Sequence, residues 1–148
     1  MRKNHGFTLI ELLVTIAVLA IVASFAVPSF KSIIENQKLT KSTNSLVQEI
    51  KAARIKAILD KKEITLKLNS SAADAGYIFN WKPEGEVSLK VASDNELKFN
   101  GNGILTSAFS VIELCKVSVF TPAKPTNSKK ITLTKFGQVE KIEDGSCP

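Results

Sequence analysis

The residues that usually carry acid–base or metal chemistry are few in this chain. His5 is the single histidine, and it lies within the first six residues. Glu84 and Glu86 flank a glycine, and Asp94 and Glu96 flank an asparagine, so both carboxylate pairs fall in turn-like stretches where solvated charges are common. A catalytic pair needs an environment that separates the two pKa values, and no cleft signature surrounds these residues. We therefore expect no enzymatic activity, no cofactor and no metal site.

The two cysteines, Cys115 and Cys147, both lie in the last third of the chain. A cytosolic metal site normally needs more ligands, whereas a domain in an oxidising compartment needs only an even number of cysteines. We therefore predict a disulfide between Cys115 and Cys147. It would close a loop of about 30 residues and stabilise the fold by roughly 3 to 4 kcal/mol in the chain-entropy account. Two unpaired buried thiols are the alternative.

The length of the chain limits the number of domains, and its net charge limits the classes of partner. The chain has 148 residues, which fits one domain with a modest core and excludes a multidomain enzyme. It carries 20 Lys and Arg residues against 14 Asp and Glu residues, a formal net charge of +6. This basic balance permits contact with a polyanion or a membrane surface without requiring either.

The N-terminal segment combines a short basic leader with a long apolar run. Residues 1–6 include Arg2 and Lys3, and residues 7–27 carry Glu11 as their one formal charge. A helix over this run would be about 31 Å long, which matches the hydrocarbon core of a bilayer. The basic leader places the N-terminus in the cytoplasm and the rest of the chain outside it. We therefore predict one membrane span before the remaining residues.

Two ordinary interpretations of this segment leave a feature unexplained. A cleaved secretory signal has a small-x-small site at Ser24-Phe25-Ala26, but a carboxylate inside the apolar run is unusual for such a signal. A plain single-pass anchor fits the length, yet an ionisable group in lipid costs about 2 to 3 kcal/mol and normally has a partner. A plain anchor therefore leaves Glu11 unexplained.

A third interpretation accounts for the carboxylate. The residues Gly6-Phe7-Thr8-Leu9-Ile10-Glu11, after a short basic leader, resemble the prepilin processing motif of type IV pilins and of type II secretion pseudopilins. The resemblance implies that a prepilin peptidase cuts between Gly6 and Phe7 and that Phe7 is then N-methylated. It also implies that Glu11 pairs with the N-terminal amine of a neighbouring subunit during assembly.

The rest of the N-terminal half is predicted to continue the helix. After Pro28, apolar residues recur at spacings of three, four and seven, with charged residues between them, which is typical of an amphipathic helix. Pro28 should kink this helix because its ring lacks an N–H. We predict one long bent helix from about Thr8 to Leu59. It comprises a hydrophobic transmembrane and assembly part, residues 7–28, and an amphipathic part, residues 29–60.

Beyond residue 60 the hydrophobic period changes to two, which predicts short strands separated by turns. No helix-length segment separates these strands, so residues 61–148 should form an antiparallel sheet or small β-sandwich, which we call the headpiece. The fold class is therefore α+β, with a long N-terminal helix packed on the headpiece, as in pilins. The predicted strands cover residues 64–68, 77–81, 87–91, 96–99, 115–120, 131–134 and 138–142.

The C-terminal third shows a second resemblance. A cysteine before a strand, the stretch Ile131-Thr132-Leu133 leading to a turn at Gly137, and the terminal Cys147-Pro148 resemble the GspH/FimT (FimU-like) group of minor pilins and pseudopilins. In some FimT proteins this glycine turn carries arginines that contact DNA. Both arginines are absent here. The candidate DNA contacts that remain are the four lysines near the turn, Lys129, Lys130, Lys135 and Lys141.

These resemblances imply a minor pilin, a structural subunit of the initiation or tip complex of a type IV pilus. The alternatives are a minor pseudopilin of a type II secretion system and a DNA-binding pilin for natural transformation, with DNA binding not favoured. The expected partners are other pilin or pseudopilin subunits, prepilin peptidase and the membrane. The expected location is the bacterial inner membrane, single-pass with the headpiece in the periplasm, followed by the pilus or pseudopilus.

Overall fold

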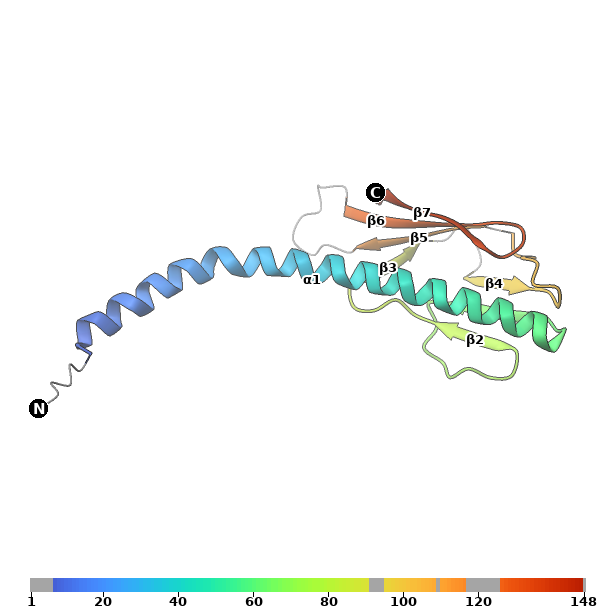
Figure 1. Cartoon of the computed structure of the whole chain (residues 1–148), viewed down its shortest axis with the longest axis horizontal. Helices are drawn as coiled ribbons and strands as arrows, with labels where there is room; N and C mark the ends of the chain where they lie inside the picture. The colour runs from blue at the N-terminus through green and yellow to red at the C-terminus, as the bar shows by residue number, and fades with distance from the viewer. Residues whose placement is uncertain (1–6, 91–94, 109, 117–125, 148) are drawn as a thin grey trace, which may run out of the picture. The chain divides into compact units, whose positions relative to one another are not determined.

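The computed structural model of the chain describes residues 7–90, 95–108, 110–116 and 126–147. At positions 26–29, 31, 32, 126, 127 and 146 it describes the backbone alone. The chain divides into two compact units, the first ending at Ile34 and the second beginning at Glu35. The β-strands and the second half of the helix belong to the second unit (Figure 1).

Helix α1 runs from Leu9 to Asp60, a length of 52 residues, which confirms the predicted bounds to within one residue. It ends at Lys61, whose φ of 54° places the backbone in the left-handed conformation that commonly closes helices. Helical backbone continues through Pro28, although this proline has no N–H to donate to the carbonyl of Ser24. The kink at Pro28 stays a prediction.

The first sheet has three strands in the order β2-β1-β4. Strand β1 (Ile64–Leu68) pairs antiparallel with β4 (Glu96–Phe99) and parallel with β2 (Ile78–Trp81). The parallel pair arises because residues 69–77 return the chain to the end of the sheet where β1 begins. This is an exception in a headpiece whose other strand pairs are antiparallel, as predicted.

The second sheet has four antiparallel strands in the order β3-β5-β6-β7. They are β3 (Val87–Lys90), β5 (Val111–Lys116), β6 (Thr126–Leu133) and β7 (Val139–Cys147). Strand β5 begins four residues before the predicted strand, and predicted residues 117–120 lie outside the described residues. Strands β6 and β7 extend through polar residues with no apolar alternation, because cross-strand pairing overrides the weak local preference.

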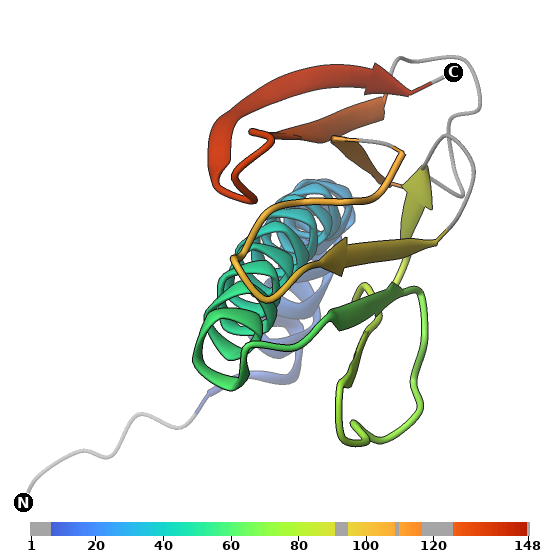
Figure 2. The ribbon, with the colours of Figure 1, turned by 90° about the vertical axis from the view of Figure 1, so that its right-hand side faces the viewer.

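One hydrophobic core joins the helix to both sheets. Figure 2 shows the strands curving around one side of the second half of α1 and leaving the opposite side uncovered. The helix contributes residues spaced by seven, four, three and four positions, so they share one face. This confirms the predicted amphipathic helix. The buried helical residues are Leu39, Leu46, Ile50, Ala53 and Ala57, and their main partners are Ile64, Leu66, Leu97, Phe99, Ile112, Leu114 and Ile131.

The last residue of β2 and the segment after it contact the helix through two serine hydroxyls. The indole Nε1 of Trp81 donates to Ser45 Oγ at 3.1 Å, and the backbone N of Glu84 donates to Ser42 Oγ at 3.0 Å. Trp81 and Ser42 are both buried. The hydroxyls therefore satisfy donors that would otherwise lose their water partners at this contact.

An ion pair ties the start of the second unit to the second sheet. Lys116 Nζ on β5 lies 2.8 Å from Glu35 Oε2 on α1, and the two side chains are only 14% and 13% exposed. Charges with so little solvent contact depend on each other, because removing one leaves the other poorly solvated. This pair therefore fixes β5 to the helix where the second unit begins.

Candidate assembly helix and headpiece surfaces

From Phe7 to Phe25, the residues before α1 and the first part of that helix expose their large apolar side chains. Phe7 is 81% exposed, Leu9 76% and Leu19 65%, and the remaining large apolar residues up to Phe25 are also exposed. An apolar surface of this extent marks an interaction site. In the part of the chain that the structure describes, no helix combines the length and apolar character needed to cross a bilayer.

Glu11, the one charged residue in this apolar part, caps the start of its own helix. Its Oε2 accepts hydrogen bonds from the backbone N and the hydroxyl of Thr8, at 3.3 and 3.2 Å, and its own backbone N donates to Thr8 Oγ1 at 3.3 Å. This reciprocal arrangement is a capping box, which satisfies N–H groups that the first helical turn leaves free. Glu11 is therefore placed one turn from Phe7.

The two internal hydroxyls of this apolar part are satisfied locally. Thr15 Oγ1 donates to the carbonyl of Leu12 at 2.8 Å, and Ser24 Oγ donates to the carbonyl of Ile21 at 2.7 Å. Because these donors bond to the backbone of their own helix, they leave no polar group in need of water. The surface that this part presents to a partner is thus chemically apolar apart from Glu11.

The predicted processing site is only partly within the described residues. Phe7 is described, whereas Gly6 lies outside the described residues. Cleavage between Gly6 and Phe7 and N-methylation of Phe7 therefore stay predictions. His5 also lies outside the described residues.

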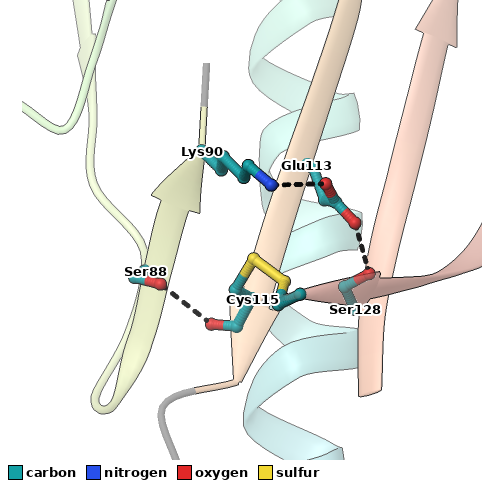
Figure 3. Close-up of a disulfide and its surroundings, with 6 residues drawn as sticks. Ser88, Lys90, Glu113, Cys115 and Ser128 are labelled. Carbon is teal, nitrogen blue, oxygen red and sulfur yellow. Dashed lines mark hydrogen bonds and ion pairs between the residues drawn. A yellow bond between two sulfur atoms is a disulfide. The ribbon is translucent and has the colours of Figure 1, made fainter. Parts of the chain in front are cut away.

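Cys115 and Cys147, the predicted pair, form a disulfide, with Cα atoms 5.9 Å apart. The bridge connects β5 to the end of β7 across the intervening strand β6 (Figure 3). Ser128 of β6 lies opposite Cys115 in the sheet register and is fully buried. The disulfide therefore fastens the last strand over the outer face of the sheet.

Three of the four candidate DNA-contacting lysines are engaged with carboxylates. Lys129 pairs with Asp144, and both Lys130 and Lys141 pair with Glu143, at 4.0 and 2.6 Å. The hydrogen bond from Lys141 holds the pKa of Glu143 below its ordinary value, and the same bond raises the pKa of Lys141. Two carboxylates therefore offset part of the positive charge of these three lysines.

The fourth lysine, Lys135, precedes the turn at Gly137, which is anchored to the helix. Arg54 Nε donates to the carbonyl of Phe136 at 2.8 Å and lies 3.3 Å from the carbonyl of Gly103. Gly137 has a φ of 69°, and a Cβ there would lie 2.8 Å from the ring of Phe99. The turn thus needs glycine for packing against the core. The arginine that contacts this turn, Arg54, belongs to α1 and donates to backbone carbonyls of the headpiece.

One member of each carboxylate pair considered in the sequence is held in an ion pair. Glu84 pairs with Lys41 at 2.9 Å, and Glu96 lies 3.7 Å from Lys67 and 3.5 Å from Lys98. Asp94 lies outside the described residues. Surface pairs of this kind contribute little to stability, and they leave Glu84 and Glu96 as solvated structural charges.

Comparison with known proteins gives one family match and two relatives. Residues 1–27 match the prokaryotic N-terminal methylation motif. Two curated fimbrial proteins of Pseudomonas aeruginosa are each 36% identical to the chain over 64 residues. The chain is therefore similar to these fimbrial proteins over part of its length. The match spans 43% of this chain and 41% of each relative, so it covers less than half of their length. No solved structure gives a significant match.

The methylation motif contains Gly6, Phe7 and Glu11, the residues that the sequence resemblance singled out. The α+β layout, with its N-terminal helix packed on the strands of the headpiece, is pilin-like as well. Assignment to the GspH/FimT group stays a prediction.

Sequence reasoning missed the roles of Thr8 and Arg54. The spacing Thr8-x-x-Glu11 is the signature of a capping box, so Thr8 could have been found from the sequence. Arg54 carries no such signal, because its partners are carbonyl groups 49 and 82 residues away in the chain.

Proposed function

We propose that this chain is a minor pilin, a structural subunit that assembles into a type IV pilus through the first half of α1. The observation that carries this proposal is the exposed apolar surface from Phe7 to Phe25, which begins within the processing motif. Burying that surface against the equivalent helices of neighbouring subunits would supply the driving force for assembly, at about 25 cal/mol per Å² of apolar area. A place in the initiation or tip complex follows from the resemblance to minor pilins.

The same proposal gives the route to the filament. Prepilin peptidase removes residues 1–6, and the apolar residues 7–28 anchor the mature chain at the bacterial inner membrane before it assembles. The headpiece faces the periplasm. The disulfide between Cys115 and Cys147 supports this location, because such bonds persist in oxidising compartments.

A pair of matched substitutions tests the role of the helix. Leu13 and Ile142 are both exposed, at 53% and 45%, but Leu13 lies in the apolar half of α1 and Ile142 on strand β7. We expect Leu13→Lys to remove the chain from filaments sheared off the cell surface, because a charge in an apolar contact is costly. Ile142→Lys should assemble like the parent. Equal recovery of both variants in filaments would contradict the proposal.

A pseudopilin of a type II secretion system is the alternative that shares this helix. Deletion of the gene in its native bacterium distinguishes a minor pilin from a pseudopilin. The proposal predicts loss or reduction of surface pili with normal protein secretion. Loss of secretion with normal pili would assign the chain to the secretion system instead.

A further inference from the structure

The outer face of the second sheet brings a carboxylate to the disulfide. Glu113 and Cys115 are two residues apart on β5, so they point to the same face. A carboxylate oxygen of Glu113 and the two sulfur atoms of Cys115 and Cys147 all lie within 4.8 Å of one another. Figure 3 shows Glu113 above the disulfide, between Lys90 and Ser128. Among the described residues, this is the one group of three side chains of the metal-ligating kinds His, Cys, Asp and Glu.

The position of this carboxylate is fixed by its neighbours. Ser128 Oγ donates to Glu113 Oε1 at 2.6 Å, and Lys90 Nζ lies 3.9 Å from Oε2. Gly145 on β7 completes the enclosure, because a Cβ there would lie 2.5 Å from Ser128 Oγ and 2.7 Å from Glu113 Oε1. Any side chain at position 145 would displace the hydrogen-bonded pair. The hydrogen bond from Ser128 and the close approach of Gly145 thus hold Glu113 beside the sulfur atoms. An ion pair with Lys90 could form without either of these features.

Two thiolates and one carboxylate suit a tetrahedral zinc-type ion. Zn–S bonds of about 2.3 Å at tetrahedral angles place two sulfurs about 3.8 Å apart, and a carboxylate oxygen about 3.5 Å from each. The 5.9 Å separation of the Cα atoms of Cys115 and Cys147 allows such an opening by side-chain rotation. A hydrogen bond to the ligating carboxylate, as Ser128 makes to Glu113, is the usual support for a metal ligand.

We infer that the reduced form of this chain binds one zinc-type divalent cation through Cys115 Sγ, Cys147 Sγ and the Glu113 carboxylate. Ser128 acts as a positioning residue, and water fills the fourth place. Reduction by a phosphine breaks the S–S bond, adds two electrons and two protons to the sulfurs, and converts the phosphine with water to its oxide. Each thiol then releases its proton to solvent as the cation binds. The disulfide and the metal site are therefore mutually exclusive.

Cobalt titration of the full-length, tag-free chain in nonionic detergent tests this site. After reduction with a water-soluble phosphine, Co²⁺ should bind at one ion per chain and give the charge-transfer absorption of thiolate ligands. Zn²⁺ should displace it. The oxidised chain should give no such band. Absence of the band in the reduced chain, or its presence in the oxidised chain, overturns the proposal.

Matched variants identify the carboxylate ligand. Glu113→Gln should weaken zinc binding by about ten-fold or more, whereas Glu140→Gln, which alters an exposed glutamate on β7, should leave the affinity unchanged. Equal affinities for these two variants would remove Glu113 from the site. If Glu113→Gln does not fold, Ser128→Ala replaces it, because loss of the 2.6 Å hydrogen bond should weaken zinc binding several-fold. Unchanged zinc affinity in that variant would contradict the positioning role of Ser128.

Discussion

Thr8 and Glu11 cap the first turn of α1 reciprocally: the backbone N and hydroxyl of Thr8 donate to the Glu11 carboxylate, and the backbone N of Glu11 donates to the Thr8 hydroxyl. Glu11 therefore has a partner in its own chain before a second subunit arrives. Experiments must therefore distinguish two roles of Glu11: capping its own helix, and pairing with the N-terminal amine of a neighbouring subunit.

Two substitutions of Glu11 separate the roles. Gln keeps the side-chain acceptor of a capping box but has no charge, whereas Ala removes both. We expect Glu11→Gln and Glu11→Ala each to abolish incorporation into filaments, because the charge is needed for the partner amine. Thermal unfolding of the headpiece should stay unchanged in both. Normal assembly of Glu11→Gln would show that Glu11 acts through the cap alone.

The contact of Arg54 with the Gly137 turn predicts a clear loss of stability. Replacing Arg54 with Leu should lower the free energy of unfolding by about 1.5 to 3 kcal/mol, because hydrogen bonds from a charged donor to the carbonyls of Phe136 and Gly103 are lost. Lys51→Leu, at an exposed position on the same helix, serves as the control. Urea unfolding of the full chain in detergent measures both. Equal stability of the two variants would contradict the anchoring role.

The ion pair between Glu35 and Lys116 predicts strongly non-additive effects. Glu35→Leu alone and Lys116→Met alone should each cost about 3 kcal/mol, because the remaining charge is left poorly solvated. The double variant Glu35→Leu, Lys116→Met should unfold close to the parent, since neither charge remains. A double-mutant cycle by urea unfolding gives the coupling directly. Additive losses would mean that the two charges act independently.

The ion pairs of the C-terminal strands predict weak binding to DNA. Lys129, Lys130 and Lys141 are paired with Asp144 or Glu143, so they must break these contacts to reach a phosphate. We expect little affinity for duplex DNA at physiological salt and some binding at low salt. Anisotropy titration at the two salt concentrations measures this difference. Tight, salt-resistant binding that disappears when the four lysines are replaced would make the chain a DNA-uptake pilin.

Periodicity predicted the helix well because the signal is long and regular. The positions of Leu46, Ile50, Ala53 and Ala57 follow the 3.6-residue period, and all four are fully buried. Strands β1 and β4 were likewise predicted with their observed bounds, because apolar residues alternate with polar ones along both. In the helix and in these two strands, the hydrophobic pattern is carried by residues close together in the sequence, so it can be recognised without knowledge of the fold.

Elements that depend on distant partners were predicted less well. The first half of β6 and the last half of β7 are polar and form a ladder through pairs such as Lys129 with Asp144. The approach of β7 to Ser128 depends on Gly145, and the anchor of the Gly137 turn depends on Arg54. In each case the deciding contact joins residues far apart in the chain, which no local pattern records.

Processing and assembly as a pilin would leave a direct trace in the mass of the mature chain. Intact mass spectrometry of the protein purified from its native filaments or membrane measures it. We expect a mature chain that begins at Phe7, carries one added methyl group on its N-terminal amine and retains the disulfide between Cys115 and Cys147. A mature chain that begins at Val27, as cleavage after Ser24-Phe25-Ala26 would produce, or one that retains Met1 to Gly6, would contradict it.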